Sequence, residues 1–268
     1  MATYASNIPA IDPSKLIIVG GGPVGLGLAI ELGQRGIANV VIERNATISP
    51  IPKGQNLTQR TAEHFHFWGA EKQLRAARPF PADFGMGGLT TYGELFSPYS
   101  YNWLARELVR PFYFTENERL PQYATEQVLR ARVAELSNVE VLYGWKAETI
   151  GQDAEGAFVD VAKLDGSERR VLRAPYLAGC DGAWSTVREA AGLTQTLTEH
   201  EKVMVLLVFR SQALHHMLKH QAVSFISDAG GTWWYASPQT DTRIRVMKQR
   251  ALEASPRKPR KPRKGVPK

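Results

Sequence analysis

The sequence of 268 residues contains one cysteine, Cys180, and no long run of apolar residues. A single cysteine excludes an intrachain disulfide and fits a reducing compartment. No stretch approaches the ~18 consecutive apolar residues of a spanning helix. Residues 1–15 also lack the charged and apolar regions of a signal peptide. We therefore expect a cytoplasmic protein without a membrane span.

Excess charge of one sign is also missing from most of the chain. The formal net charge is +7, but residues 248–268 alone carry nine Lys or Arg residues against one Glu. The rest of the chain is close to neutral, so it offers no basic surface for nucleic acid, and we expect no nucleic-acid partner. The Pro-Arg-Lys repeat of the tail lacks aromatic residues for base stacking and cannot bury a core. Residues 248–268 are therefore expected to form a basic, disordered tail.

The histidines do not form a metal-binding pattern. His216 and His220 would share one helical face, with His215 beside them, but no Cys, Asp or Glu lies among them. We expect a solvated helix face there and no metal site.

What the sequence does contain is a strand, glycine turn, helix and second strand at residues 15–44. The apolar run from Leu16 to Val19 is typical of a buried parallel strand and ends in a turn. Three glycines satisfy the Gly-x-Gly-x-x-Gly pattern, which combines a tight turn, close approach to a pyrophosphate and close packing of the helix: Gly20, Gly22 and Gly25. Phosphates are expected at the helix N-terminus, beside Pro23 and Val24. The unit predicts that the chain binds an adenine dinucleotide.

The helix and second strand of this unit also carry position-specific predictions. Three residues at four-residue spacing predict the apolar face of the helix: Val24, Leu28 and Leu32. Gly36 is placed to end the helix. The next strand, Val40 to Ile42, delivers Glu43, 21 residues after Gly22 and placed to accept hydrogen bonds from ribose hydroxyls. The alternative is a glycine-rich turn in another α/β protein, with Glu43 a solvated strand end.

The remaining chain divides into further predicted elements. Helical spacing predicts helices at 58–69 and 125–136, and residues 139–143 form a predicted strand. Alternation between turns predicts an antiparallel hairpin or meander over 146–176, followed by a buried strand at 176–178. Short β-rich runs predict an antiparallel sheet outside the nucleotide unit, which is a candidate substrate face: 203–210, 223–226, 232–236 and 243–247.

A second signal is the strand, turn and helix at residues 176–192. Its Cys-Asp-Gly at 180–182 is followed by Ser185, Arg188 and Gly192. Together with the glycine fingerprint, this segment resembles the single-component FAD-dependent aromatic monooxygenases, the para-hydroxybenzoate hydroxylase and phenol hydroxylase-like flavoproteins, over residues 14–247.

The resemblance implies an α/β fold in two parts. A Rossmann-like, glutathione reductase-like FAD-binding domain would span 14–195, with inserted loops and strands near 79–118. Part of an antiparallel β-sheet substrate domain would span 196–247, before the tail at 248–268.

The resemblance also implies which residues hold the cofactor. In the family, the glycine motif with its following acid holds the ADP half of FAD, which is matched by Gly20, Gly22, Gly25, Glu43 and Arg44. Lys53 stands where arginine is usual. Gln122, ahead of Glu126, Leu129 and Arg130, matches a glutamine that touches the flavin side. Asp181 and Gly182 match a motif associated with both FAD and the pyridine nucleotide.

The implied activity is hydroxylation of a small phenolic or related aromatic substrate by FAD, NAD(P)H and O₂, through a flavin C4a-hydroperoxide. No catalytic residue is assigned, and a homodimer is compatible with the sequence.

Two other functions stay open. The family's third flavin motif, a Gly-Asp pair, does not occur in the chain, which turns into the basic tail as if truncated. The first alternative is therefore a noncatalytic or defective FAD-binding fragment. The second is a nicotinamide-only dehydrogenase, against which Gln122 and the Asp-Gly pair argue.

Overall fold

The structure is a computed structural model whose chain divides into two compact units, residues 1–83 with 105–196 and residues 84–104 with 197–268. The structure describes part of the chain: residues 15–50, 54, 56–78, 88–91, 100–102, 110–196, 202–210, 224–227, 231–234 and 243–251. Three of the predictions fall on residues outside the described part of the chain. They concern the histidines at which no metal site is expected (His215, His216 and His220), Lys53, and residues 252–268 of the predicted tail.

A four-stranded parallel sheet forms the centre of the first unit. Its order is β11-β1-β2-β7, and every neighbouring pair is parallel. The strands are β1 (Lys15–Val19), β2 (Ala38–Glu43), β7 (Val139–Tyr143) and β11 (Tyr176–Gly179). The strands predicted from the apolar runs near residues 16, 40, 139 and 176 are thereby confirmed.

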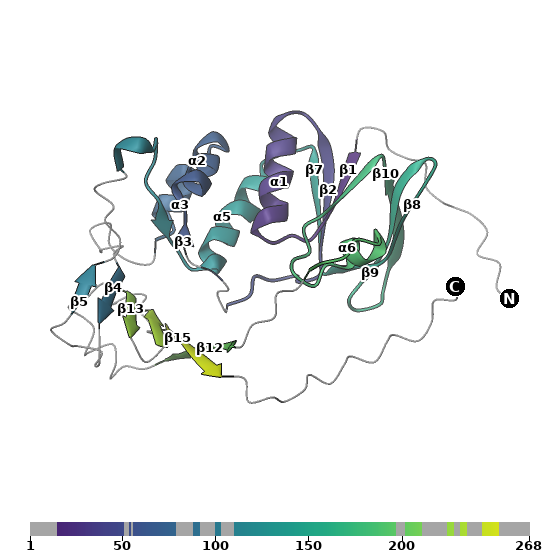
Figure 1. Cartoon of the computed structure of the whole chain (residues 1–268). Coiled ribbons are helices and arrows are strands. Elements are labelled where there is room, and N and C mark those ends of the chain that lie inside the picture. Colours follow the sequence, from purple (N-terminus) through teal and green to yellow (C-terminus); the bar gives the residue numbers. More distant parts are fainter. Residues whose placement is uncertain are drawn as a thin grey trace. The chain divides into compact units, whose positions relative to one another are not determined.

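Helices cover one face of this sheet (Figure 1). They are α1 (Pro23–Gln34), α2 (Gln59–Phe67), α3 (Glu71–Ala76) and α5 (Gln122–Ala134). Ile18 and Val41 point from the sheet into this layer and pack with Leu26, Ile30 and Phe65. The predicted helices at 58–69 and 125–136 are confirmed, whereas the short helix α3 was not predicted.

The predicted apolar face of α1 is confirmed in part. Leu28 and Leu32 are partly buried and pack against the helical core, but Val24 is 72% exposed. The fully buried positions are Leu26, Ala29 and Ile30 together with three glycines. The small residues let α1 approach its neighbours closely, since a Cβ at Gly27 would lie 2.8 Å from the Trp68 ring. The spacing of large side chains therefore located only the edge of the buried face, because small residues make up its centre. Gly36 lies just past the helix with φ +78, as expected of a residue that ends it.

An antiparallel meander covers the other face of the parallel sheet. Its strands are β8 (Trp145–Asp153), β9 (Gly156–Lys163) and β10 (Arg169–Ala174), in the order β10-β9-β8. Alternate residues of β1 and β2, such as Ile17 and Val40, pack here on Trp145, Val159 and Val161. The prediction of a meander over 146–176 is confirmed.

Strand β11 forms an edge of the parallel sheet. Among the described strands it pairs with β1 alone, and Tyr176 at its start is 72% exposed. The prediction of a buried strand was wrong at this point because an edge strand has a neighbour on one side only. It leads into the short helix α6 (Thr186–Ala190).

A buried charge cluster connects α3 to a small two-stranded ladder of β3 (Asn56–Leu57) and β6 (Glu118–Arg119). Strand β6 follows the 3₁₀ helix η1 (Arg110–Phe112) in the chain. The Glu118 carboxylate is fully buried and accepts hydrogen bonds from Arg75 Nη1 and Arg78 Nε, both at 2.7 Å. Arg75 also donates to Thr115 Oγ1 and to the carbonyl oxygen of Glu116. One acid therefore holds Arg75 of α3 and Arg78, which lies two residues past the end of α3, against the β6 segment.

A six-stranded sheet makes up the described part of the second unit. Its order is β12-β15-β14-β13-β4-β5, from β4 (Gly88–Thr91), β5 (Ser100–Asn102), β12 (Lys202–Arg210), β13 (Ser224–Ser227), β14 (Gly231–Trp234) and β15 (Arg243–Ala251). The pairs are antiparallel except β13 with β4, which is parallel.

The division of the chain differs from the expected one in two places. The strands expected as insertions near 79–118 of the first domain pair instead with the second sheet, because β4 aligns on β13. Strand β15 runs to Ala251 and so passes the expected start of the tail at 248. Among the described residues, no helix is long and apolar enough to cross a membrane.

Candidate cofactor site

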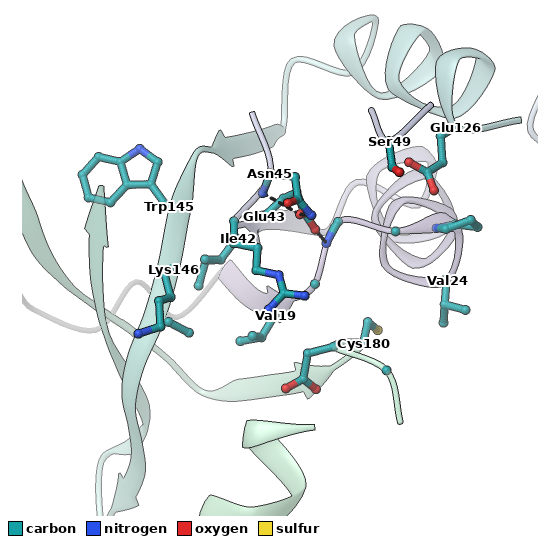
Figure 2. Close-up of a pocket in the computed structure, with 18 of the residues that line it drawn as sticks. Val19, Val24, Ile42, Glu43, Asn45, Ser49, Glu126, Trp145, Lys146 and Cys180 are labelled. Carbon is teal, nitrogen blue, oxygen red and sulfur yellow. Dashed lines mark hydrogen bonds between the residues drawn. The ribbon is translucent and has the colours of Figure 1, made fainter. Parts of the chain in front are cut away.

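One pocket of about 370 Å³ lies where the four parallel strands end. Its walls come from the residues after β1, β2, β7 and β11, together with one face of α5. Open α/β sheets bind ligands at the carboxyl ends of their strands, and small-molecule sites span about 300–1,000 Å³. The position and the size of the pocket are those of a ligand site, and Figure 2 shows its lining.

The glycine turn forms the floor of the pocket. Gly20 has φ +106, and a Cβ there would lie 2.3 Å from the Cys180 carbonyl oxygen. A Cβ on Gly25 would lie 1.8 Å from the Gly20 carbonyl oxygen, whereas a Cβ on Gly22 meets nothing within 4 Å. Gly20 and Gly25 are thus required by packing, and Gly22 leaves open space at the start of α1.

The N-terminus of α1 is open toward that space. Gly22 is the N-cap residue and makes no side-chain cap, and Pro23 takes the first helical position. The first N–H groups of a helix lack partners within the helix, and together with the helix dipole they attract anions. This end of α1 can hold a phosphate without a lysine or arginine.

Glu43 is fixed beneath the turn. Its carboxylate accepts hydrogen bonds from the Gly21 N–H at 2.8 Å and from the backbone and side chain of Asn45, both at 2.7 Å (Figure 2). A Cβ on Gly21 would lie 2.6 Å from Glu43 Cβ, so this glycine is also required. The two carboxylate oxygens have about four acceptor sites, of which three are used here. One acceptor site remains for a ligand hydroxyl.

Asp181 shapes the opposite wall by capping α6. Its carboxylate accepts from Ser185 Oγ at 2.5 Å, from the Thr186 N–H at 2.6 Å and Oγ1 at 2.9 Å, and from the Val187 N–H at 3.3 Å. Partial burial favours a higher pKa for Asp181, but these hydrogen bonds outweigh it and hold the pKa below its ordinary value. The carboxylate is thereby committed to the turn that carries Gly182 and Trp184 at the pocket.

Replacing Asp181 with alanine is expected to cost about 0.5–2 kcal/mol of stability at pH 7, as loss of a helix cap does. Because folding lowers the pKa of Asp181, this stabilisation is complete at any pH above the unfolded-state pKa, which is near 3.9. It disappears as the pH falls through the lower pKa of the folded state. Chemical denaturation from pH 7 to pH 3 measures it. Asp181→Asn is the control, since it keeps the shape of the cap and removes the titration. A stability gap between wild type and Asp181→Ala that stays constant down to pH 3 would contradict the assignment.

Helix α5 lines the pocket with a polar stripe. Gln122, Glu126 and Arg130 stand four residues apart and all reach the pocket. Gln122 Nε2 donates to Glu126 Oε1 at 2.6 Å, and its backbone N–H donates to the Gly54 carbonyl at 3.0 Å. Arg130 Nη1 donates to the Ala46 carbonyl at 3.0 Å. The stripe connects α5 to the loops that follow β2.

Two further groups near the pocket have shifted pKa values. Burial and the neighbouring Asp181 raise the pKa of the Cys180 thiol, which therefore stays protonated at neutral pH. Burial, assisted by Glu43 and Glu126, raises the pKa of Tyr143 against the opposing effect of Arg130. Neither group is prepared to act as a nucleophile or base.

The structure gathers most of the site residues that the sequence predicts. All but two line the pocket: Gly20, Gly22, Pro23, Val24, Glu43, Arg44, Gln122, Asp181 and Gly182. Gly25 packs beneath the turn, and Lys53 lies outside the described residues. Sequence reasoning gave no role to Glu126 and Arg130, although their spacing from Gln122 places them on one helix face. It gave none to Gly21, Asn45 or Trp145, for which the sequence has no comparable signal.

Known proteins resemble this chain over most of its length. The profile of the family described as "FAD binding domain" matches residues 14–264. A para-nitrophenol 4-monooxygenase of Pseudomonas sp. (strain WBC-3) is 32% identical over 201 residues, which cover 75% of this chain and 48% of that protein. The chain thus spans about half the length of this relative.

Solved structures share the fold. The p-nitrophenol 4-monooxygenase PnpA of Pseudomonas putida DLL-E4 superposes with a TM-score of 0.68 at 26% identity, over 91% of this chain and 59% of that one. The flavin-dependent monooxygenase PieE, solved with FAD and substrate, gives 0.77 at 22% identity, over 92% and 45%. The fold is therefore the Rossmann-like α/β fold of FAD-dependent monooxygenases. The chain belongs to the FAD-binding domain family, whose match includes the glycine turn and Glu43 within residues 14–264.

Proposed function

We propose that this chain holds FAD for an NAD(P)H-dependent monooxygenase that hydroxylates a phenolic or related aromatic compound. The observation that carries the proposal is the pocket at the strand ends, where the open N-terminus of α1 faces the fixed Glu43. The residues fit the ADP half of FAD. The helix N-terminus at Gly22 would take the pyrophosphate, and the free acceptor site of Glu43 would take a ribose hydroxyl.

The charges that line the pocket allow an anionic ligand. The three carboxylates that line it are each engaged inside the protein: Glu43 by Gly21 and Asn45, Glu126 by Gln122, and Asp181 by α6. Arg44, Arg130 and Lys146 line the same pocket. The formal charges of these three cations and three carboxylates balance, so it is the open N-terminus of α1 that favours a pyrophosphate at this side of the pocket.

Bound FAD would supply the redox chemistry, passing two electrons from NAD(P)H to O₂ so that one oxygen enters the aromatic ring and the other leaves as water. The chain's own residues bind and orient. The Asp181 cap fixes the turn at Gly182, and α5 brings Gln122 to the pocket. No described residue is assigned as the base for a phenol.

An FAD-holding fragment without hydroxylase activity is the second candidate. It is favoured by the absence of a Gly-Asp pair anywhere in the 268 residues. The two candidates share the ADP site and differ in whether the bound flavin is reduced and used.

The test is a titration of the chain with FAD followed by visible absorbance, with anaerobic addition of NADH or NADPH and a panel of phenols. We expect saturable FAD binding, and bleaching that a phenol accelerates would support the monooxygenase. FAD binding without bleaching would support the second candidate, an FAD-holding fragment without hydroxylase activity. A cooperatively folded chain that binds no FAD would overturn the proposal.

A further inference from the structure

The side chain of Arg130 on α5 makes its contacts with residues outside that helix. Its guanidinium lies over the Tyr143 ring, with Cζ 4.1 Å from the centroid, and Nη1 donates to the Ala46 carbonyl at 3.0 Å. Its Nε is buried and has no hydrogen-bond partner within the part of the chain that the structure describes. The side chain also lines the cofactor pocket.

The two contacts of Arg130 connect it to the ribose end of the pocket. Ala46 lies in the loop that follows β2, directly after Glu43, Arg44 and Asn45. Tyr143 pairs with Glu43 in the β2–β7 register. Arg130 thus fastens the loop that begins directly after Glu43 and contains Asn45, while its guanidinium rests over the Tyr143 ring.

The unpaired Nε indicates a ligand contact. A buried donor without an acceptor is costly, and protein structures pair the large majority of buried side-chain polar atoms. The guanidinium cannot lose its charge, and its planar donors suit phosphate and sugar oxygens. An acceptor entering the pocket beside Arg130 would complete its hydrogen bonding.

We infer that Arg130 positions the adenosine end of the bound dinucleotide, both by fastening the 44–49 loop and by offering its unpaired donor to the nucleotide. This rests on the proposed function, in that it deepens the assignment of the same pocket. It gives the arginine of the α5 stripe a role separate from that of Gln122, which lies two turns earlier.

The test uses ADP, which carries the adenosine and pyrophosphate but no flavin, and FMN, which carries the flavin but no adenosine. Binding of each is measured by calorimetry to wild type, Arg130→Met, Arg130→Lys and Tyr143→Leu. We expect Arg130→Met to weaken ADP about tenfold or more, as loss of a charged hydrogen bond does, and to leave FMN unchanged. Arg130→Lys should recover part of the affinity. Tyr143→Leu should weaken ADP binding by a smaller factor. Tyr143 is not among the residues that line the pocket, so it would act only through its contact with Arg130.

The controls separate this role from simple destabilisation. Arg169 is 74% exposed on β10, so Arg169→Met should leave ADP binding unchanged. Thermal melts of the unliganded variants set a temperature at which each is folded. Wild-type ADP affinity in folded Arg130→Met would overturn the inference while leaving the proposed function intact. If Arg130→Met does not fold, wild-type ADP affinity in Arg130→Lys overturns it equally. A wild type that binds neither ADP nor FAD would overturn the proposed function itself.

Discussion

Gly25→Ala is expected to destabilise the chain by more than about 3 kcal/mol and to abolish FAD binding, because the added methyl group meets backbone that cannot rotate away. The new Cβ would lie 1.8 Å from the Gly20 carbonyl oxygen and 3.3 Å from Cys180 Cβ. Relief requires α1 to move off the glycine turn, which displaces the helix N-terminus from the pocket. Stability is measured by urea unfolding and by the melting temperature, which should fall by about 6–12 °C.

Gly22→Ala is the matched comparison, since the same methyl group meets nothing within 4 Å there. The loss of stability should not exceed about 1 kcal/mol, the range for a poorer N-cap. The methyl group would instead occupy space at the pyrophosphate position, so FAD affinity should drop at least tenfold in a protein that melts almost as the wild type does. The explanation fails if Gly25→Ala is as stable as Gly22→Ala.

Glu118→Gln is expected to cost about 3 kcal/mol, the lower end of the range for breaking a buried ion pair. The substitution keeps the side-chain volume but leaves Arg75 and Arg78 without their shared carboxylate. The lower end applies because the two arginine side chains keep 28% and 19% exposure and can be partly hydrated. Urea unfolding at pH 7 measures the difference in the free energy of unfolding.

Glu116→Gln provides the contrast two residues away. Glu116 and Arg110 form an ion pair at 2.6 Å, but their side chains are 60% and 62% exposed. Exposed pairs contribute about 0–1 kcal/mol, so this substitution should change stability by less than about 0.5 kcal/mol. Equal effects at positions 116 and 118 would show that burial of the Glu118 cluster contributes little.

The nucleotide unit could be predicted from the sequence because its constraints are local. A glycine that must accept φ +106, a helix start without a capping side chain and an acid at the end of the next strand all lie within thirty residues. Each leaves a mark on residue type at a fixed spacing. Gly20, Gly22 and Glu43 accordingly line one pocket in the structure, and their contacts with a dinucleotide stay a prediction.

Features that depend on distant partners could not be predicted in the same way. The buried face of α1 contains glycines because Trp68 and Val139 press on it, and neither contact is visible in the sequence around residue 27. The alignment of β4 on β13 joins segments more than a hundred residues apart. The role of Arg130 depends on Ala46 and Tyr143, which only the tertiary structure brings together.

The placement of β1 between β2 and β11 has a consequence for the order in which the chain folds. Pairing β1 with β2 joins Leu16 to Asn39, whereas pairing it with β11 joins Leu16 to Tyr176. Contacts between residues far apart in sequence form slowly, since the entropy of a long loop is lost before the contact is gained. The half of the pocket around Glu43 can thus form early, while the wall at Asp181 waits for the last strand of the parallel sheet. A chain emerging from the ribosome should be unable to retain the dinucleotide until that strand has docked.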